Sequence, residues 1–104
     1  MNCQFPDEYY DIVVIRGAIE HFSQENQLLI FNKVWKTLKT GGFFCGDTVA
    51  NPNPNSSVLL EHHEHEWKDE TQMREELELV FNVVETYTVS SRSRISLFWR
   101  CLKI

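Results

Sequence analysis

The spacing of hydrophobic residues separates strands from helices along the first half of the chain. Residues 12–15 (Ile-Val-Val-Ile) form an unbroken apolar run, typical of a central parallel strand with both faces covered. Between residues 24 and 39 apolar positions recur every three or four residues, which predicts an amphipathic helix. Ser23 is suited to cap its start, and Gly41 and Gly42 are suited to end it with a left-handed residue. The apolar stripe of this helix is expected to comprise Leu28, Ile30, Phe31, Val34, Trp35 and Leu38.

A second strand is expected immediately after this helix, at residues 42–47. Because the connections are short, the two strands should be parallel and joined by a right-handed crossover. Residues 51–57 contain two Asn-Pro pairs and predict a loop, since the residue before a proline is biased away from helix. The pattern in residues 58–67 is ambiguous.

The last third of the chain predicts one helix and two strands. The helix should run from residue 70 to residue 81, with Asp69 as its cap. Residues 83–89 and 95–104 are rich in strand-forming side chains. The polar turn between them is so short that these two strands should be antiparallel neighbours. The apolar side of the helix is expected to comprise Met73, Leu77, Val80 and Phe81.

Together these elements predict an α/β fold with about four strands and two main helices. Two strands should be parallel, and the other two should form a C-terminal antiparallel hairpin. The length of 104 residues allows one small domain, so residues 1–104 are interpreted as a single unit with a modest core.

The charge balance argues against a nucleic-acid partner. The formal net charge is -5, whereas binding to a phosphate backbone needs clustered Lys and Arg. Arg92, Arg94 and Arg100 form the one basic group, which is interpreted as a solvated hairpin. No apolar run approaches the ~20 residues that cross a bilayer, so no membrane partner is expected either.

The three cysteines, Cys3, Cys45 and Cys101, predict a reducing environment. Their number is odd, they are widely spaced, and no CxxC pair occurs. Cys45 and Cys101 are expected to be small core residues. Since the first residues also lack a signal peptide, a cytoplasmic location is expected.

Four short segments, in order and suitably spaced, resemble one enzyme family. Residues 5–8 (FPDE) precede the first strand, and residues 18–22 (AIEHF) follow it. Residues 34–42 (VWKTLKTGG) end the first helix, and residues 63–67 (HEHEW) precede the second. These segments are similar to those of class I S-adenosylmethionine-dependent methyltransferases from the fourth strand onward. The chain thus resembles the C-terminal half of that doubly wound fold.

The resemblance implies which residues would form a methyl-transfer site. The backbone of Arg16, Gly17 and Ala18, just past the first strand, would line the methionine end of the cofactor. Glu20 and His21 would face the acceptor, where His21 could act as a general base near neutral pH. The acceptors implied are small molecules, and their identity is not implied.

One feature of the family is missing from the sequence. Members hold the cofactor with a glycine-rich turn after their first strand and an acidic residue after their second. The four glycines here form no GxGxG turn, and residues 5–8 lie where the family begins its fourth strand. We therefore expect a truncated, methyltransferase-like domain that does not bind S-adenosylmethionine or catalyse transfer as an isolated chain. The alternative is a non-catalytic, self-associating binding or assembly module.

The run Glu-His-His-Glu-His-Glu at residues 61–66 raises the question of metal binding. His and Glu are zinc ligands, yet the spacing is not that of HExxH and no cysteine is nearby. The segment is interpreted as a solvated approach to Trp67, and no metal site is expected.

The strand from Ile12 to Ile15 is expected to pair with a strand of another chain. In the whole fold another strand pairs with it, so in this chain it would be an exposed apolar edge, which recruits other strands. A homodimer or a heteromer through this strand is therefore expected, with a small-ligand pocket between two protomers as a weaker possibility.

Overall fold

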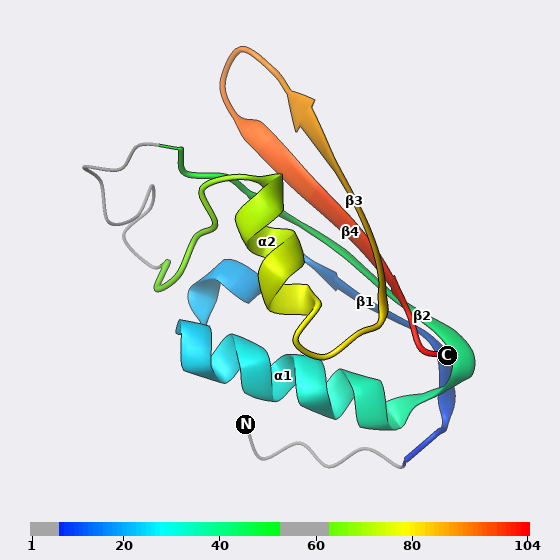
Figure 1. The fold of residues 1–104 in the computed structure, drawn as a ribbon. Helices are drawn as coiled ribbons and strands as arrows, with labels where there is room; N and C mark the ends of the chain where they lie inside the picture. Colours follow the sequence, from blue (N-terminus) through cyan, green and yellow to red (C-terminus); the bar gives the residue numbers. More distant parts are fainter. Residues whose placement is uncertain (1–6, 53–62) are drawn as a thin grey trace.

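The structure is a computed structural model that describes residues 7–52 and 63–104. Its first half is a strand–helix–strand unit (Figure 1). Strand β1 (Tyr10–Arg16) leads to helix α1 (Gln24–Thr37), and strand β2 (Leu38–Val49) follows directly. β1 and β2 are parallel neighbours, so the predicted parallel strand–helix–strand unit is confirmed.

The second half adds a helix and a hairpin. Helix α2 (Glu70–Leu77) precedes strands β3 (Val83–Ser90) and β4 (Ile95–Leu102). The hairpin is antiparallel, and β4 inserts beside β2, which gives the sheet order β1-β2-β4-β3. The predicted fold class is therefore confirmed: four strands, two of them parallel, a C-terminal hairpin and two main helices.

Both helices cover the same face of the sheet (Figure 1). The core lies between them and the strands, where Phe44 and Trp99 from the sheet pack against Phe31 of α1 and Trp67. The opposite face is not covered by any described element. The expectation that both faces of the first strand are buried is therefore wrong for the chain by itself, because Ile12 and Val14 are each more than half exposed.

Helix α1 ends at Thr37, two residues before the expected end, and Lys39 belongs to β2. The reason lies in how the last carbonyls are satisfied. The carbonyls of Lys36 and Thr37 accept hydrogen bonds of 2.8 Å from the backbone amides of Glu8 and Tyr9. These non-local bonds replace the glycine cap that the sequence suggested.

The two glycines act within β2 instead of at the helix end. Gly41 has φ of 88°, and the register of the β1–β2 pair shifts between Tyr10 and Ile12. At Gly42 a Cβ atom would lie only 2.9 Å from the carbonyl oxygen of Asp11. A left-handed residue and a residue without a side chain are therefore needed here to let β1 approach the start of β2.

The buried faces of the helices differ slightly from the expected stripes. Leu28 and Trp35 lie at the solvent edge of α1, and Gln27 is buried in their place. Helix α2 ends at Leu77, although Phe81 beyond it is still buried in the core. Gln27 is buried because its side-chain amide reaches the carbonyl oxygens of Ile19, Phe22 and His65.

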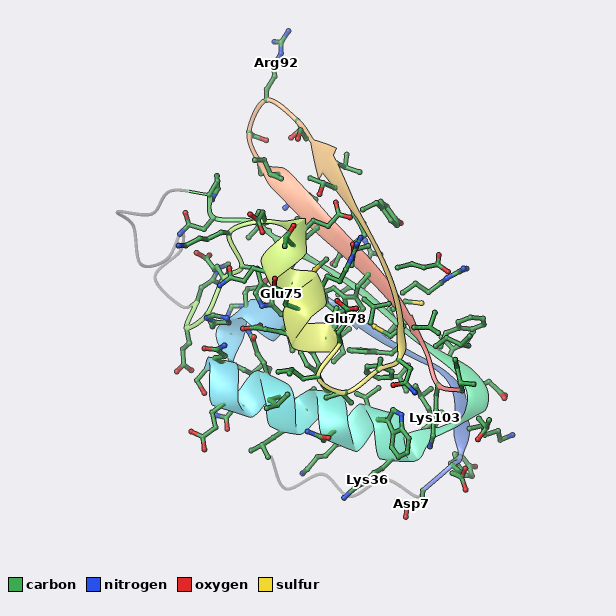
Figure 2. All side chains as sticks on the ribbon, in the orientation of Figure 1. Asp7, Lys36, Glu75, Glu78, Arg92 and Lys103 are labelled. Atoms are coloured by element: carbon green, nitrogen blue, oxygen red, sulfur yellow. The ribbon has the colours of Figure 1, made fainter. Side chains whose placement is uncertain are left out.

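The remaining expectations have mixed outcomes. Arg92 stands at the exposed hairpin tip (Figure 2), in agreement with a solvated hairpin, and Arg100 pairs with Glu85 at 2.9 Å. Cys101 is fully buried, whereas Cys45 is only half-buried, since it lies on the uncovered face. Within the described ranges, no helix is long and apolar enough to span a membrane. Residues 1–6 and 53–62 lie outside the described residues, and with them Cys3 and most of the predicted loop.

Candidate functional site

The candidate site lies at the carboxyl ends of the parallel strands β1 and β2. Ligands of open α/β sheets bind at this edge, where the loops after the strands begin. Gly17 follows β1 with φ of 58°, and its amide donates to Asp47 Oδ1 at 3.0 Å. Arg16 Nε donates to the other oxygen, Oδ2, at 3.2 Å. Asp47 thus ties the turn after β1 to β2, and the Gly17 amide is already engaged.

The 3-10 helix η1 (Ile19–His21) turns the next side chains in two directions. Ile19 is fully buried and anchors the turn in the core. Glu20 is also buried, and Thr48 Oγ1 donates to its Oε2 at 2.8 Å. His21 is exposed. The two predicted catalytic residues are therefore neighbours, but Glu20 points into the protein and His21 lies at the surface.

Gln27 of α1 holds the loop in place. Its Nε2 atom lies within hydrogen-bond distance of three carbonyl oxygens: Ile19 at 2.9 Å, Phe22 at 3.2 Å and His65 at 3.1 Å. One buried amide thus joins η1 to the segment before α2. Because Gln27 is polar, the apolar periodicity of α1 did not indicate this position.

The segment from His63 to Trp67 is not a solvated approach to α2, and that interpretation is wrong for two of its residues. His63 and Glu66 are both buried. His63 Nδ1 contacts Glu66 Oε2, and Asn51 Nδ2 donates to Glu66 Oε1 at 3.1 Å. On its other side, His63 Nε2 lies 3.7 Å from Glu20 Oε1. These two side chains are buried because Glu20 of η1 and Asn51, just after β2, supply partners for their polar groups.

Glu76 of α2 fixes the other half of this segment. Its carboxylate contacts the indole Nε1 of Trp67 and lies 3.1 Å from His65 Nε2. Trp67 is buried, so the segment is anchored in the core at one end and at Glu20 at the other. Two backbone amides, those of Glu64 and His65, also donate to the Glu20 carbonyl.

An open depression of about 420 Å³ lies over this edge of the sheet. Arg16, Gly17 and Glu20 line one side of it, and Asp47 and Thr48 line the other. With Arg94 and Ser96, which also line it, two carboxylates, two guanidinium groups and two hydroxyls meet in a space that suits a polar small molecule. The depression brings together three of the five predicted site residues.

Ala18 and His21 do not line the depression. Sequence reasoning missed Asp47 and Thr48, and it considered His63 and Glu66 only as part of a run that it interpreted as solvated. An acidic residue at the carboxyl end of a parallel strand was a usable signal for Asp47. For the others, the spacing of neighbouring residues carries no such signal, because their partners are distant in the chain.

Comparisons with known proteins agree with this architecture. The family model described as "Methyltransferase domain" matches residues 1–46. No curated protein sequence matches the chain. The PH0226 protein of Pyrococcus horikoshii OT3 superimposes with a TM-score of 0.75 and 17% identity, over 99% of this chain and 56% of that one.

Two further solved structures are similar. A putative methyltransferase of Haloferax volcanii, in complex with the methyltransferase activator Trm112, has a TM-score of 0.76 and 13% identity, over 97% of this chain and 57% of that one. Phosphoethanolamine N-methyltransferase 2 of Haemonchus contortus, in complex with phosphomonomethylethanolamine and S-adenosylhomocysteine, is also similar. It has a TM-score of 0.72 and 14% identity, over 96% of this chain and 35% of that one. The chain spans only about a third to three-fifths of the length of these three proteins. The resemblance to methyltransferases is thus confirmed: the chain has the α/β fold of the S-adenosylmethionine-dependent methyltransferases and spans part of that domain.

Proposed function

We propose that this chain forms the acceptor side of an S-adenosylmethionine-dependent methyltransferase for small molecules. The observation that carries the proposal is the polar depression at the carboxyl ends of β1 and β2, in a fold shared with such enzymes. Class I enzymes work largely by proximity, so a wall that positions the acceptor is a functional part.

The residues after β1 fit only part of the cofactor. Gly17 places backbone at the rim without a side chain, which suits close approach of a ligand. Its amide, however, already donates to Asp47, and the sequence has no glycine-rich turn for the remainder of the cofactor. We therefore propose that residues outside 1–104, in the same protein or in a partner, complete the site. The bound cofactor would supply the methyl group.

Glu20 and His21 take different roles in this proposal. Glu20 is buried at the wall of the depression and would orient a hydroxyl or amine of the acceptor. His21 is at the surface beside it and would accept the proton that the acceptor loses. The Haloferax relative binds an activator protein, which makes a protein partner for this chain reasonable as well.

Calorimetry tests the proposal in two steps. Residues 1–104 titrated with S-adenosylhomocysteine should give no binding heat, whereas micromolar affinity of the isolated chain would contradict the need for a second part. The upstream reading frame is the first place to seek a GxGxG-bearing complement, and the co-expressed complex should bind the ligand. In that complex, His21→Ala should lower methyl transfer about 10²-fold or more while S-adenosylhomocysteine still binds. Arg92→Ala is the control, because Arg92 stands at the exposed hairpin tip and does not line the depression.

A non-catalytic assembly module is the second candidate, and the uncovered face of the sheet supports it. Ile12 and Val14 on β1 and Tyr87 and Val89 on β3 are each half-exposed or more. Such an apolar face favours a homodimer or heteromer. Light scattering at micromolar concentration should show a dimer that Ile12→Lys dissociates, with Leu79→Lys on the other side as control. A stable monomer would contradict this candidate.

A further inference from the structure

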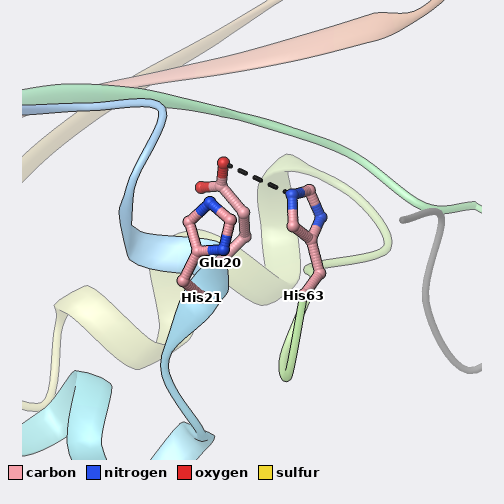
Figure 3. A group of neighbouring side chains, drawn as sticks. All are labelled: Glu20, His21 and His63. Atoms are coloured by element: carbon pink, nitrogen blue, oxygen red, sulfur yellow. Dashed lines mark ion pairs between the residues drawn. The ribbon is translucent and has the colours of Figure 1, made fainter. Parts of the chain in front are cut away.

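Three side chains with metal-binding atoms meet beside the depression. The ligand atoms of Glu20, His21 and His63 all lie within 4.8 Å of one another. Figure 3 shows that Glu20 and His21 come from η1, whereas His63 comes from the segment before α2. The Glu20 carboxylate and the His63 ring face each other, 3.7 Å apart, and the two imidazole centroids are 4.9 Å apart.

The His63 ring lies between two buried carboxylates, those of Glu66 and Glu20. Its Nδ1 atom contacts the buried carboxylate of Glu66, which accepts hydrogen bonds when ionised, so Nδ1 carries the hydrogen. In the neutral ring, Nε2 then presents a lone pair to the carboxylate of Glu20. A metal ion between Nε2 of His63 and Oε1 of Glu20 would therefore have a ligand atom on either side, and buried charged groups are commonly paired or coordinate a metal ion.

The surroundings hold two of the three ligands in position. Glu66 orients the His63 ring through Nδ1, the carboxylate–histidine arrangement that is common behind metal ligands. Asn51 holds Glu66 in turn, and Thr48 holds the second oxygen of Glu20, which leaves Oε1 to face His63. These polar groups come from separate parts of the chain, and each is buried. The pair is therefore preorganised before any ion arrives.

We propose that Glu20, His21 and His63 bind one divalent transition-metal ion. Two imidazoles and one carboxylate favour zinc and its neighbours over magnesium. In a tetrahedral zinc site, ligand atoms lie about 3.4 Å apart, as metal–ligand bonds of about 2.0–2.2 Å imply. The 3.7 Å between Glu20 and His63 is already close to that value, so the exposed His21 makes most of the adjustment.

Three protein ligands leave a fourth position for an exogenous ligand, which is the pattern of catalytic metal sites. Glu20 also lines the 420 Å³ depression, so the ion would lie at its wall. The role of the ion, in contrast to its binding, rests on the proposed function. An acceptor oxygen at the fourth position would lose its proton to solvent more easily, since the metal lowers its pKa. With the ion bound His21 would be a ligand and the acceptor proton would pass to solvent, whereas in the metal-free site His21 keeps the role of base given to it above.

Calorimetry with the metal-free chain at pH 7.5 tests binding without any cofactor. ZnCl₂ should bind with one-to-one stoichiometry and micromolar or tighter affinity. Glu20→Gln and His21→Ala should each weaken that affinity at least tenfold. Both variants should still fold, because Gln matches Glu in shape and His21 is exposed. His65→Gln is the matched control, since His65 lies in the same segment but pairs with Glu76. Its affinity should be unchanged.

Several results would overturn the proposal. A flat zinc titration of the folded chain, or equal weakening by His65→Gln, would place any binding elsewhere. Magnesium binding as tightly as zinc would contradict a transition-metal site. Failure of the co-expressed complex to bind S-adenosylhomocysteine would remove the proposed function but leave zinc binding by these three residues intact, so the two ideas fail separately.

Discussion

Substitution of Gly46 by alanine should destabilise the sheet more than its small size suggests. Gly46 is in the middle of β2, opposite Ile15 of β1 on one side and Trp99 of β4 on the other. A Cβ atom at this position would lie closer than 3.0 Å to two ring carbons of Trp99 and to the carbonyl oxygen of Ile15. Neither neighbour has room to move, because Trp99 is only 2% exposed and the carbonyl belongs to a paired strand.

The expected cost follows from overpacking. One extra carbon in a packed core costs about 1–3 kcal/mol. The clash with backbone places this position at the upper end, so we expect about 3 kcal/mol. For a chain of this size that is a large share of the total free energy of unfolding, which is roughly 0.05–0.15 kcal/mol per residue. Gly17→Ala is the comparison: its φ of 58° is unfavourable, but an added Cβ meets nothing within 4 Å. Its cost should be about 1 kcal/mol.

Urea unfolding followed by far-ultraviolet circular dichroism measures both variants. With a slope of about 1–3 kcal/mol per molar urea, Gly46→Ala should lower the midpoint by more than about 1 M. The double variant with Trp99→Phe should cost less than the sum of the two single changes, because the smaller ring relieves the clash. A loss for Gly46→Ala no greater than for Gly17→Ala, or strict additivity with Trp99→Phe, would refute this reasoning.

Three other predictions follow from burial and charge. Met73→Ala in the core should lower the free energy of unfolding by about 2–5 kcal/mol, whereas Leu79→Ala, which is 71% exposed, should change it by less than about 0.5 kcal/mol in the same urea assay. Hydrogen bonds from two threonine hydroxyls of β3 lower the pKa of Glu70 from its usual 4.5. The ionised carboxylate therefore stabilises the fold above that pH, and this stabilisation is lost as the pH falls below it. Glu70→Gln should flatten the dependence of unfolding free energy on pH in that range, and an unchanged dependence would contradict this. Burial raises the pKa of Cys101 to about 12, so a thiol reagent at pH 8 should modify Cys101 more slowly than Cys45; peptide mass mapping that finds the reverse order would contradict the packing.

The helix starts show where short-range information was enough. Ser23 accepts a hydrogen bond from the Asn26 amide, and Asp69 accepts one from the Gln72 amide, as their positions before apolar stripes predicted. Both partners lie within one turn, so the chain needs no distant residue to form either cap. The end of α1 was not predicted correctly, because its last carbonyls accept hydrogen bonds from the segment before β1. Gly41 and Gly42 therefore do not cap the helix and instead belong to β2.

The candidate site likewise contains some residues that the local sequence indicated and others that only folding brings together. Arg16, Gly17 and Glu20 were recognisable because they follow a strand in a segment that resembles a known family, and they do lie at the depression. His63 was interpreted as solvated because a His/Glu-rich segment reads as polar surface. Its burial depends on Glu20, which folding brings to it from the other half of the chain.

The sequence by itself determined the order of strands and helices, the parallel crossover, the hairpin and the family resemblance. These depend on periodicity and on residues close together in the chain. Only the tertiary structure decided which polar side chains are buried together, since a buried charge needs a partner and the available partner was distant in sequence. It also decided which face of β1 remains open, because that depends on where both helices pack. The polar network around Glu20 and the apolar face with Ile12 are consequences of packing that no local pattern contains.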